Sequence, residues 1–289
     1  MSRVYLNGRF LPLEQACVSV MDRGFLFGDG VYEVIPAYGG HLFRLEAHLM
    51  RLDASLAAVR IGNPHDPVTW KAMLQTLVSE AGEGDCSVYL QVTRGVDSKR
   101  GHAFPTARVS PTVFAMASPL HPPDPAQLST GISARIMADT RWARCDIKAI
   151  TLLPNILLRQ AALDAGDDEA ILVRNGEALE GTSSSLFIVN DGVLITPPKG
   201  TALLPGVTRD LVLKLAADHG LPWAERGIKE AELRAADEIW LTSSTREIMA
   251  VTRLDGIVFS GGRPGPVWQD MMGWYQACKA SLRAGGDCL

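Results

Sequence analysis

Residues 141–155 read RWARCDIKAITLLPN and contain one lysine, Lys148, inside a mostly apolar run. Ile147 and Ala149 flank this lysine, and Ile150 follows directly. Lysine is almost never fully buried unless it is paired. Lys148 is therefore either an exposed residue at the edge of a strand, with its ammonium group in water, or an amine held inside the protein for a chemical purpose. The surrounding sequence separates these two interpretations.

Composition limits the class of protein. The chain has 289 residues, of which 47% are hydrophobic and 21% charged, as is typical of a globular protein with a sizeable core. Its 28 basic and 32 acidic residues give a net charge of −4 without a long basic run, so we expect no nucleic-acid partner. The N-terminal segment lacks a signal-peptide pattern, and no apolar stretch is long enough to span a membrane. We therefore expect a cytoplasmic protein without a membrane partner.

Five cysteines lie scattered along the chain and form no CxxC pair. Structural zinc sites and disulfide frameworks are typically marked by recurrent, closely spaced cysteines. We therefore expect no metal site and five reduced thiols. Cys145 lies close to Lys148, but the usual role of such a cysteine is that of a small buried hydrophobe.

The first part of the chain combines helices and strands. Apolar residues recur at helical spacing over residues 45–59 and 70–78, which predicts two amphipathic helices. The segments SVYLQVTRG (residues 87–95) and PTVFAMA (residues 111–117) predict strands. Four prolines then fall between residues 119 and 125, and proline favours extended chain. We place an interdomain linker at residues 119–127, between an N-terminal domain (residues 1–118) and a second domain (residues 128–289).

The second domain contains the same mixture of elements. The segments ISARIMA (132–138), AILVRNGEALEG (170–181) and SSSLFIVNDGVLIT (183–196) predict strands, with turns at Asn175-Gly176 and Asp191-Gly192. Helices are expected over residues 155–165, 208–219 and 267–283, and Thr208 is the start signal of the second. The sequence thus predicts an α+β protein of two domains.

An imine-forming amine is the sharper interpretation of Lys148, because a desolvated lysine has a lowered pKa and attacks carbonyl carbons. Pyridoxal phosphate would use such a lysine, but it also needs an anion site and an acid beside its pyridine nitrogen. The segment GVTRD (residues 206–210) opens a helix with Thr208 as the candidate N-cap, and a helix start can bind phosphate. Most helices that begin with threonine bind only their own cap, so this signal does not decide alone.

Two further residues allow either a structural or a cofactor-binding interpretation. Arg51 shares a helical stripe with Arg44 and His48, which is either a solvated face or a place from which a guanidinium reaches a phosphate. Glu180 ends a strand and precedes a run of hydroxyls, so it is either a solvated cap or the partner of a pyridinium nitrogen. The segment TSSTREI (residues 242–248) offers further hydroxyls after an apolar strand.

Six segments resemble, in the same order and at similar spacing, those of the branched-chain-aminotransferase-like (class IV) family of pyridoxal phosphate enzymes, and most closely its D-amino acid transaminases. They are DRGFLFGDGVYEV, YLQVTRG, RWARCDIKAITLL, EGTSSS, LLPGVTRD and TSSTREI. The similarity runs from about residue 3 to about residue 275. It implies fold type IV, with a small N-terminal α/β domain and a larger C-terminal α/β pseudo-barrel that binds the cofactor.

The resemblance also implies roles for individual residues. Lys148 would be the catalytic lysine that forms the aldimine with pyridoxal 5′-phosphate, and Glu180 the partner of the pyridine nitrogen. The remaining cofactor-binding residues would be Arg51, Leu204, Val207, Thr208, Ser243 and Ser244. The substrate-binding residues would be Tyr32, Val34, Arg100, His102 and Ser183.

The function implied is a transaminase that moves an amino group between a D-amino acid such as D-alanine and a 2-oxo acid such as 2-oxoglutarate. In such enzymes the neighbouring subunit supplies an arginine and a histidine that grip the substrate carboxylate, and SKRGHAF (residues 98–104) supplies Arg100 and His102. A homodimer is therefore implied. By this resemblance, the loop from Arg94 to Arg100 is one residue longer than in the D-amino acid transaminases, which affects the direction in which the Arg100 side chain points.

Several alternatives stay open at this point. Within the same family they are an L-branched-chain transaminase, an (R)-amine transaminase and an aminodeoxychorismate lyase. In a different class, the chain would be a pyridoxal phosphate-binding protein without turnover.

Overall fold

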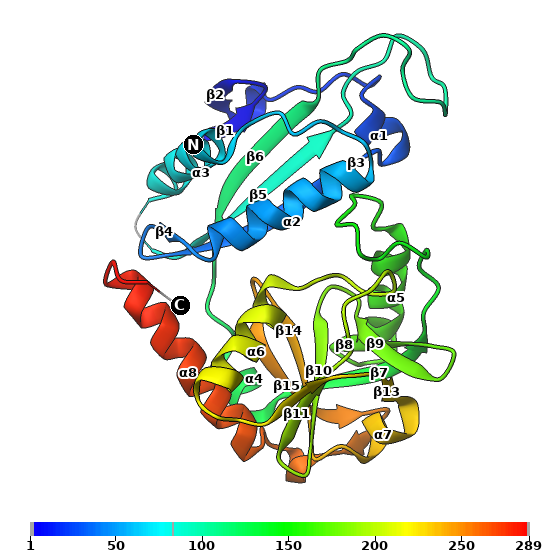
Figure 1. Cartoon of the computed structure of the whole chain (residues 1–289), viewed down its shortest axis with the longest axis vertical. Coiled ribbons are helices and arrows are strands. Elements are labelled where there is room, and N and C mark those ends of the chain that lie inside the picture. Colours follow the sequence, from blue (N-terminus) through cyan, green and yellow to red (C-terminus); the bar gives the residue numbers. More distant parts are fainter. Residues whose placement is uncertain (1–2, 83, 288–289) are drawn as a thin grey trace. The chain divides into compact units, whose positions relative to one another are not determined.

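The computed structural model describes residues 3–82 and 84–287, which form two compact units (Figure 1). Unit 1 comprises the chain up to His121, the short segment Ile147–Leu152 and the chain from Lys279 onward; unit 2 comprises Pro122–Asp146 and Leu153–Cys278. The segment that carries Lys148 therefore belongs to the same unit as the N-terminal part of the chain. The domain boundaries expected from the sequence stay a prediction, and helix α4 (Pro125–Thr130) begins inside the expected linker.

Unit 1 is built on a six-stranded antiparallel sheet in the order β2-β1-β6-β5-β3-β4. Its elements in chain order are β1 (Arg3–Leu6), β2 (Arg9–Pro12), η1 (Leu13–Gln15), α1 (Arg23–Phe27), β3 (Gly30–Tyr38), β4 (His41–Leu42), α2 (Leu45–Ala58), α3 (Pro67–Glu80), β5 (Cys86–Thr93) and β6 (Thr112–Pro119). The start of α3 is set by Asp66, whose side chain accepts a hydrogen bond from the Thr69 N–H at 2.8 Å, and by Pro67 at the first helical position.

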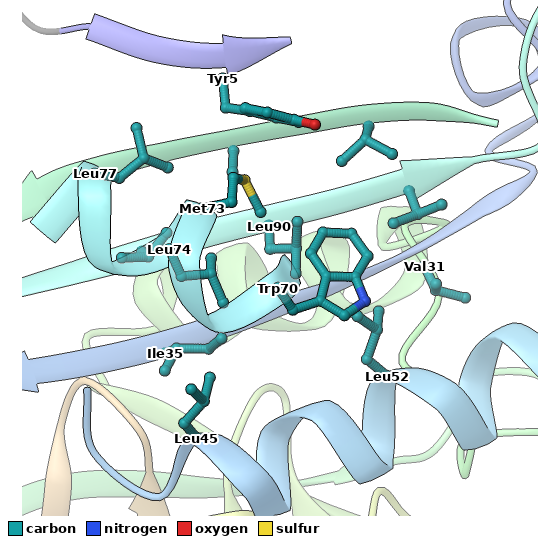
Figure 2. Close-up of a cluster of buried hydrophobic side chains, with 14 of the residues drawn as sticks. Tyr5, Val31, Ile35, Leu45, Leu52, Trp70, Met73, Leu74, Leu77 and Leu90 are labelled. Carbon is teal, nitrogen blue, oxygen red and sulfur yellow. The ribbon is translucent and has the colours of Figure 1, made fainter. Parts of the chain in front are cut away.

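One face of this sheet is buried under α2 and α3 (Figure 2). Side chains alternate between the two faces of a strand, so Val31 and Ile35 of β3 enter the core, where side chains of both helices meet them. Glu33 lies between these two positions on the same face and is 0% exposed. Tyr32 and Val34 lie on the opposite face. A carboxylate in an apolar layer requires charged partners, and the site described below contains them.

Unit 2 contains a ten-stranded sheet that closes on itself. Its elements in chain order are α4, β7 (Ile132–Ala138), α5 (Leu153–Asp164), β8 (Glu169–Arg174), β9 (Glu177–Gly181), β10 (Ser185–Asn190), β11 (Val193–Thr196), α6 (Val207–Asp218), β12 (Trp223–Glu225), β13 (Ile228–Lys229), α7 (Glu230–Ala235), β14 (Glu238–Ser243), β15 (Glu247–Leu254), β16 (Ile257–Val258), η2 (Ser260–Gly262) and α8 (Pro266–Arg283), the last of which continues into unit 1. Strands β10, β14, β15, β7, β8 and β9 are neighbours in that order, and β9 pairs back with β10 through Glu180 opposite Ser185. This closure leaves fewer open edges, and it places Glu180 at the seam of the ring.

The strongly periodic segments fold as predicted. The helices expected near residues 45–59, 70–78, 155–165 and 267–283 are present as α2, α3, α5 and α8. Asn175 and Gly176 connect β8 to β9 with φ angles of 54° and 76°, the left-handed values that favour this pair in a tight hairpin. Local pattern therefore accounts for most of the secondary structure.

Within residues 3–82 and 84–287, no helix is both long and apolar enough to cross a bilayer, and no cluster of His, Cys, Asp and Glu side chains could hold a metal ion. Cys17, Cys86 and Cys145 are free thiols. Cys278 is disulfide-bonded, so the expectation of five reduced thiols is wrong for this residue. Its position in α8 carries no spacing motif that would have revealed the bond.

Candidate active site

The segment that carries Lys148 runs along the edge of strand β3. Val31 and Ala149 form an isolated antiparallel bridge, and the Tyr32 N–H donates to the Lys148 carbonyl at 3.0 Å. The Lys148 N–H donates to Ser55 Oγ of α2 at 3.2 Å. The backbone on both sides of the lysine is therefore fixed by unit 1, and the apolar neighbour Ile147 is buried in its core.

The Lys148 side chain is half-buried and lies over an aromatic ring. Its Nζ is 4.2 Å from the centre of the Tyr32 ring, which in turn stacks on Tyr89 at 5.8 Å. Burial, and then the charge of Glu33, raise the pKa of Tyr32, so this phenol stays neutral near physiological pH. The structure thus places the Lys148 amine beside Tyr32, as the sequence led us to expect. The Lys148 side chain keeps partial access to solvent.

A buried ionic cluster lies next to this segment on the core side of β3. Arg51 of α2 donates from Nε and Nη2 to the two oxygens of Glu33, at 2.8 and 2.7 Å. His48, one helical turn earlier, places Nδ1 2.7 Å from Glu33 Oε2. His48 is 1% exposed and Arg51 9%, so the interpretation of this helix stripe as a solvated face is wrong for both residues.

The cluster has a defined charge state. Burial raises the pKa of Glu33, but the charge and hydrogen bonds of Arg51 and His48 outweigh burial and lower this pKa to about 2. Burial lowers the pKa of His48, and the charges of Arg51 and Lys148 lower it further against the opposing effect of Glu33. The cluster therefore consists of an ionised Glu33, a charged Arg51 and a largely neutral His48. The bidentate pair fixes the plane of the Arg51 guanidinium.

Arg100 and His102 lie in the exposed loop between β5 and β6. Both contact the same aromatic side chain, Phe27 at the end of α1. The Arg100 guanidinium lies 5.1 Å from the Phe27 ring centre, and the His102 ring packs edge-on against it at 5.5 Å. The structure thus brings together the two residues expected to grip a carboxylate.

In unit 2, Glu180 is a buried carboxylate with two partners. Arg141 donates from Nη1 to Oε1 at 2.5 Å, and the Leu204 N–H donates to Oε2 at 3.1 Å. Arg141 is itself held by a bidentate pair with Asp139. Burial raises the pKa of Glu180 to about 7 while Arg141 opposes this rise. Sequence reasoning missed Arg141, although it begins the quoted segment RWARCDIKAI, because an isolated arginine has no distinguishing spacing.

The start of α6 lies close to β10. The helix begins at Val207 with Gly206 as its N-cap, and no side chain caps it. The prediction that Thr208 is the N-cap is therefore wrong, because Thr208 is already inside the first turn. A Cβ at Gly206 would lie 2.4 Å from Ser185 Oγ, so only glycine lets the chain approach β10 this closely.

Hydroxyl groups surround this part of unit 2. Ser243 is the last residue of β14 and Ser244 begins the turn to β15, where Ser243 Oγ accepts a hydrogen bond from the Arg246 N–H at 3.2 Å. Thr242 Oγ1 and Ser184 Oγ, within the described chain, are buried and have no hydrogen-bond partner. Ser183 is exposed. Buried hydroxyls without a partner suit a polar ligand.

Each unit, taken by itself, holds groups whose chemistry suits pyridoxal phosphate. Unit 1 supplies the Lys148 amine for a carbonyl carbon and the oriented Arg51 guanidinium for a phosphate. Unit 2 supplies a buried carboxylate, Glu180, for a ring nitrogen, and an uncapped helix start at Val207 and Thr208 whose N–H groups suit phosphate oxygens.

Comparison with known proteins identifies the family. The model of the family described as amino-transferase class IV matches residues 30–254. The chain belongs to the class IV aminotransferases. A D-alanine aminotransferase of Bacillus licheniformis is 40% identical over 269 residues, which cover 93% of this chain and 94% of the relative.

Solved structures of class IV aminotransferases have the same fold. The branched-chain amino acid aminotransferase of Escherichia coli superimposes with a TM-score of 0.90 at 28% identity and covers 96% of this chain and 94% of its own. A branched-chain enzyme from T.th. with pyridoxamine 5′-phosphate has a TM-score of 0.87 at 26% identity, with 96% and 94% coverage. The predicted two-domain α+β fold of type IV is confirmed. This class IV aminotransferase is a pyridoxal phosphate-dependent enzyme acting on small amino and oxo acids, and the alternative of a protein without turnover is wrong.

Proposed function

We propose that this aminotransferase is a D-amino acid transaminase, which moves an amino group between a D-amino acid such as D-alanine and a 2-oxo acid such as 2-oxoglutarate. The observation that carries the proposal is the 40% identity, over more than nine-tenths of both chains, to an enzyme named D-alanine aminotransferase. The branched-chain enzymes of similar fold are 26 and 28% identical. The joint packing of Arg100 and His102 on Phe27 supports the same proposal.

Lys148 and Glu180 have separate tasks in this proposal. Pyridoxal phosphate, when bound, supplies a carbon that reacts with amines and a conjugated ring that takes up the electrons of the substrate Cα–H bond. Lys148 Nζ accepts and returns the proton at the substrate Cα. Glu180 holds a positive charge at the pyridine nitrogen, and Arg141 fixes the orientation of this carboxylate. Arg51, the backbone at Val207 and Thr208, and the hydroxyls of Ser243 and Ser244 hold the phosphate.

Stereochemistry depends on how the substrate is oriented. Arg100 and His102 bind its carboxylate, and Tyr32, Val34 and Ser183 line the remaining space while Leu204 lies against the ring. A guanidinium binds a carboxylate through two parallel hydrogen bonds. With the amino nitrogen also fixed, the place of the carboxylate decides which enantiomer turns its Cα–H bond toward Lys148. The face of Cα that Lys148 deprotonates is then the one presented by a D-amino acid.

We also propose a cytoplasmic homodimer in which the loop with Arg100 and His102 serves the site of the partner subunit. Mixing Arg100→Ala subunits with Lys148→Ala subunits tests this arrangement, because each heterodimer would contain one intact site and one site with both defects. Activity should reappear in the mixture. Verified heterodimers that stay as inactive as the parents would exclude the cross-subunit arrangement.

A substrate screen tests the function itself. Loss of the visible absorbance of the bound cofactor is followed after addition of D-alanine, L-leucine or (R)-1-phenylethylamine, and release of pyruvate is followed after addition of aminodeoxychorismate, because a lyase regenerates the starting form of its cofactor. We expect D-alanine to react fastest. A faster reaction with L-leucine would show a branched-chain enzyme, and a faster reaction with either of the other two compounds would show an (R)-amine transaminase or a lyase.

A further inference from the structure

The short helix α1 (Arg23–Phe27) is fixed to the sheet of unit 1. The buried side chain of Asp22 accepts hydrogen bonds from the Thr93 and Thr112 hydroxyls at 3.0 and 2.6 Å, and caps the helix through the Gly24 N–H at 2.8 Å. A Cβ at Gly24 would lie 2.3 Å from Thr93 Cγ2, so α1 and β5 are in close contact. The helix is therefore a firm support for whatever binds to it.

The Arg23 guanidinium binds three consecutive carbonyl groups of the loop between β5 and β6. Its Nη1 donates to the Gly101 and Ala103 carbonyls at 2.7 and 3.3 Å, and its Nη2 donates to the His102 carbonyl at 3.4 Å. Arg23 is 3% exposed although the loop residues are exposed. One buried side chain thus holds the backbone of residues 101–103, in the segment that carries Arg100 and His102.

Asp29 balances the charge of Arg23 and links it to a second anchor. Arg23 Nε donates to Asp29 at 2.8 Å, and Arg94 donates to both oxygens of the same carboxylate at 2.7 and 2.9 Å. Burial raises the pKa of Asp29, but the two guanidinium groups outweigh it and lower this pKa. Phe104 covers the Arg94 guanidinium at 3.8 Å from its ring centre. The loop is therefore held on both sides of His102.

Phe27 connects this support to the two side chains that matter for the substrate. Its ring contacts the Arg100 guanidinium, the His102 ring and the Arg23 guanidinium, with centre distances of 5.1, 5.5 and 4.9 Å. Phe25, two residues earlier in the same helix, is 73% exposed. The contact is thus specific to one of the two aromatic side chains of α1.

We propose that Arg23 and Phe27 are positioning residues: they hold Arg100 and His102 of the same chain in the arrangement that binds a substrate carboxylate. The proposal rests on the carboxylate-binding role given to Arg100 and His102 above. In this proposal the Arg23 guanidinium fixes the path of residues 101–103 through their carbonyl groups.

The expected effect is on substrate binding. Without Arg23 the loop samples other conformations. The apparent affinity for the substrate is then the intrinsic affinity multiplied by the fraction of molecules in the binding arrangement. If that fraction falls to about one tenth, the KM for the amino acid rises about tenfold while kcat changes little. Arg23 touches no reacting atom, so the proton transfer at Cα is unaffected.

Hydrogen exchange of the holoenzyme tests the positioning directly. Arg23→Met keeps the length of the side chain and removes its donors, and Arg108→Ala, at an exposed position in the same loop, is the matched control. We expect faster amide exchange over residues 99–104 in Arg23→Met alone. Unchanged exchange in Arg23→Met would overturn the proposal.

A double-mutant comparison tests whether Arg23 acts through Arg100. The values of kcat/KM are measured for Arg23→Met, Arg100→Ala and the double variant with the best amino acid from the substrate screen. We expect the effect of Arg23→Met, about tenfold alone, to shrink to less than about twofold when Arg100 is absent. An equal effect in both backgrounds would show that Arg23 acts elsewhere.

Phe27→Leu provides a second variant if Arg23→Met does not fold, with Phe25→Leu as its control. We expect Phe27→Leu to raise KM and the control to leave it unchanged; equal effects would refute the role of Phe27. Failure of the proposed function is distinguishable, since an enzyme that prefers another amino acid fails the screen but still shows the exchange result.

Discussion

The buried pair of Glu33 and Arg51 gives a prediction that can be worked out in numbers. Replacing Glu33 with glutamine removes the negative charge and leaves the Arg51 guanidinium, 9% exposed, without its bidentate partner. The pKa of Glu33 is about 2 instead of 4.5, and this difference corresponds to about 3 kcal/mol of folding free energy. Breaking a buried ion pair generally costs about 3–5 kcal/mol, in agreement with that value.

Thermal unfolding of the cofactor-free protein measures this effect without a contribution from phosphate binding. For a chain of this size, about 3 kcal/mol lowers the Tm of Glu33→Gln by roughly 6–12 °C at pH 7. The exposed pair of Arg3 and Glu80 provides the control, and Glu80→Gln should lower the Tm by no more than about 3 °C. Adding Arg51→Met to Glu33→Gln should restore part of the loss, because the buried guanidinium that faced Glu33 is then gone as well.

The same pair makes the effect depend on pH. The pKa of Glu33 is lowered in the folded protein, so its stabilising contribution is complete above pH 4.5 and disappears as the pH falls from 4.5 toward about 2. The Tm difference between the wild type and Glu33→Gln should therefore shrink over this range. If Glu33→Gln melts like the Glu80 control at pH 7, or if the difference does not shrink in acid, the assignment of a stabilising buried pair is refuted.

Three further predictions concern the chemistry. Lys148→Ala should still bind pyridoxal phosphate noncovalently but lose its covalent attachment and nearly all transamination; turnover at the wild-type rate without added amine would overturn the role of Lys148. Glu180→Gln should keep the cofactor but slow the half-reaction with D-alanine about tenfold or more, a barrier increase of about 1.4 kcal/mol, and an unchanged rate would make Glu180 only a structural residue. Arg100→Ala should lower kcat/KM for D-amino acids by roughly ten- to a hundredfold, the loss of about 1.5–3 kcal/mol from one charge-assisted contact. An equal loss with (R)-1-phenylethylamine, which has no carboxylate, would contradict this role of Arg100.

Local pattern predicted the elements because each helix and strand carries its own periodicity. Helix α2 follows the spacing of its leucines, and the hairpin at Asn175 and Gly176 follows from the two positive φ angles that these residues adopt readily. Thr208 has the chemistry of a cap, but the N-cap of α6 is Gly206, which lies against Ser185 of β10 in a tertiary contact that the local sequence does not show.

The ionic partners within the candidate site could not be predicted, because each joins residues far apart in the sequence. Glu33 shares one face of β3 with the apolar residues Val31 and Ile35, which indicates a charged side chain facing the core. The sequence of the strand does not show that Arg51 is its partner. Similarly, Arg141 follows β7 and Glu180 lies in β9, so the two meet only when β7, β8 and β9 pair as neighbours. The six motifs located most candidate residues, and only the structure shows which neighbours fix them in position.

The membership of Ile147–Leu152 and the chain end in unit 1 has a consequence for synthesis of the protein. Unit 2 is interrupted only by these six residues. Unit 1 needs the segment around Lys148 to pair with β3, more than a hundred residues earlier in the chain, and also needs residues from Lys279 onward. On the ribosome, unit 1 therefore cannot be completed until the last helix has emerged. Until then, the segment that carries Lys148 belongs to a unit whose set of contacts is incomplete.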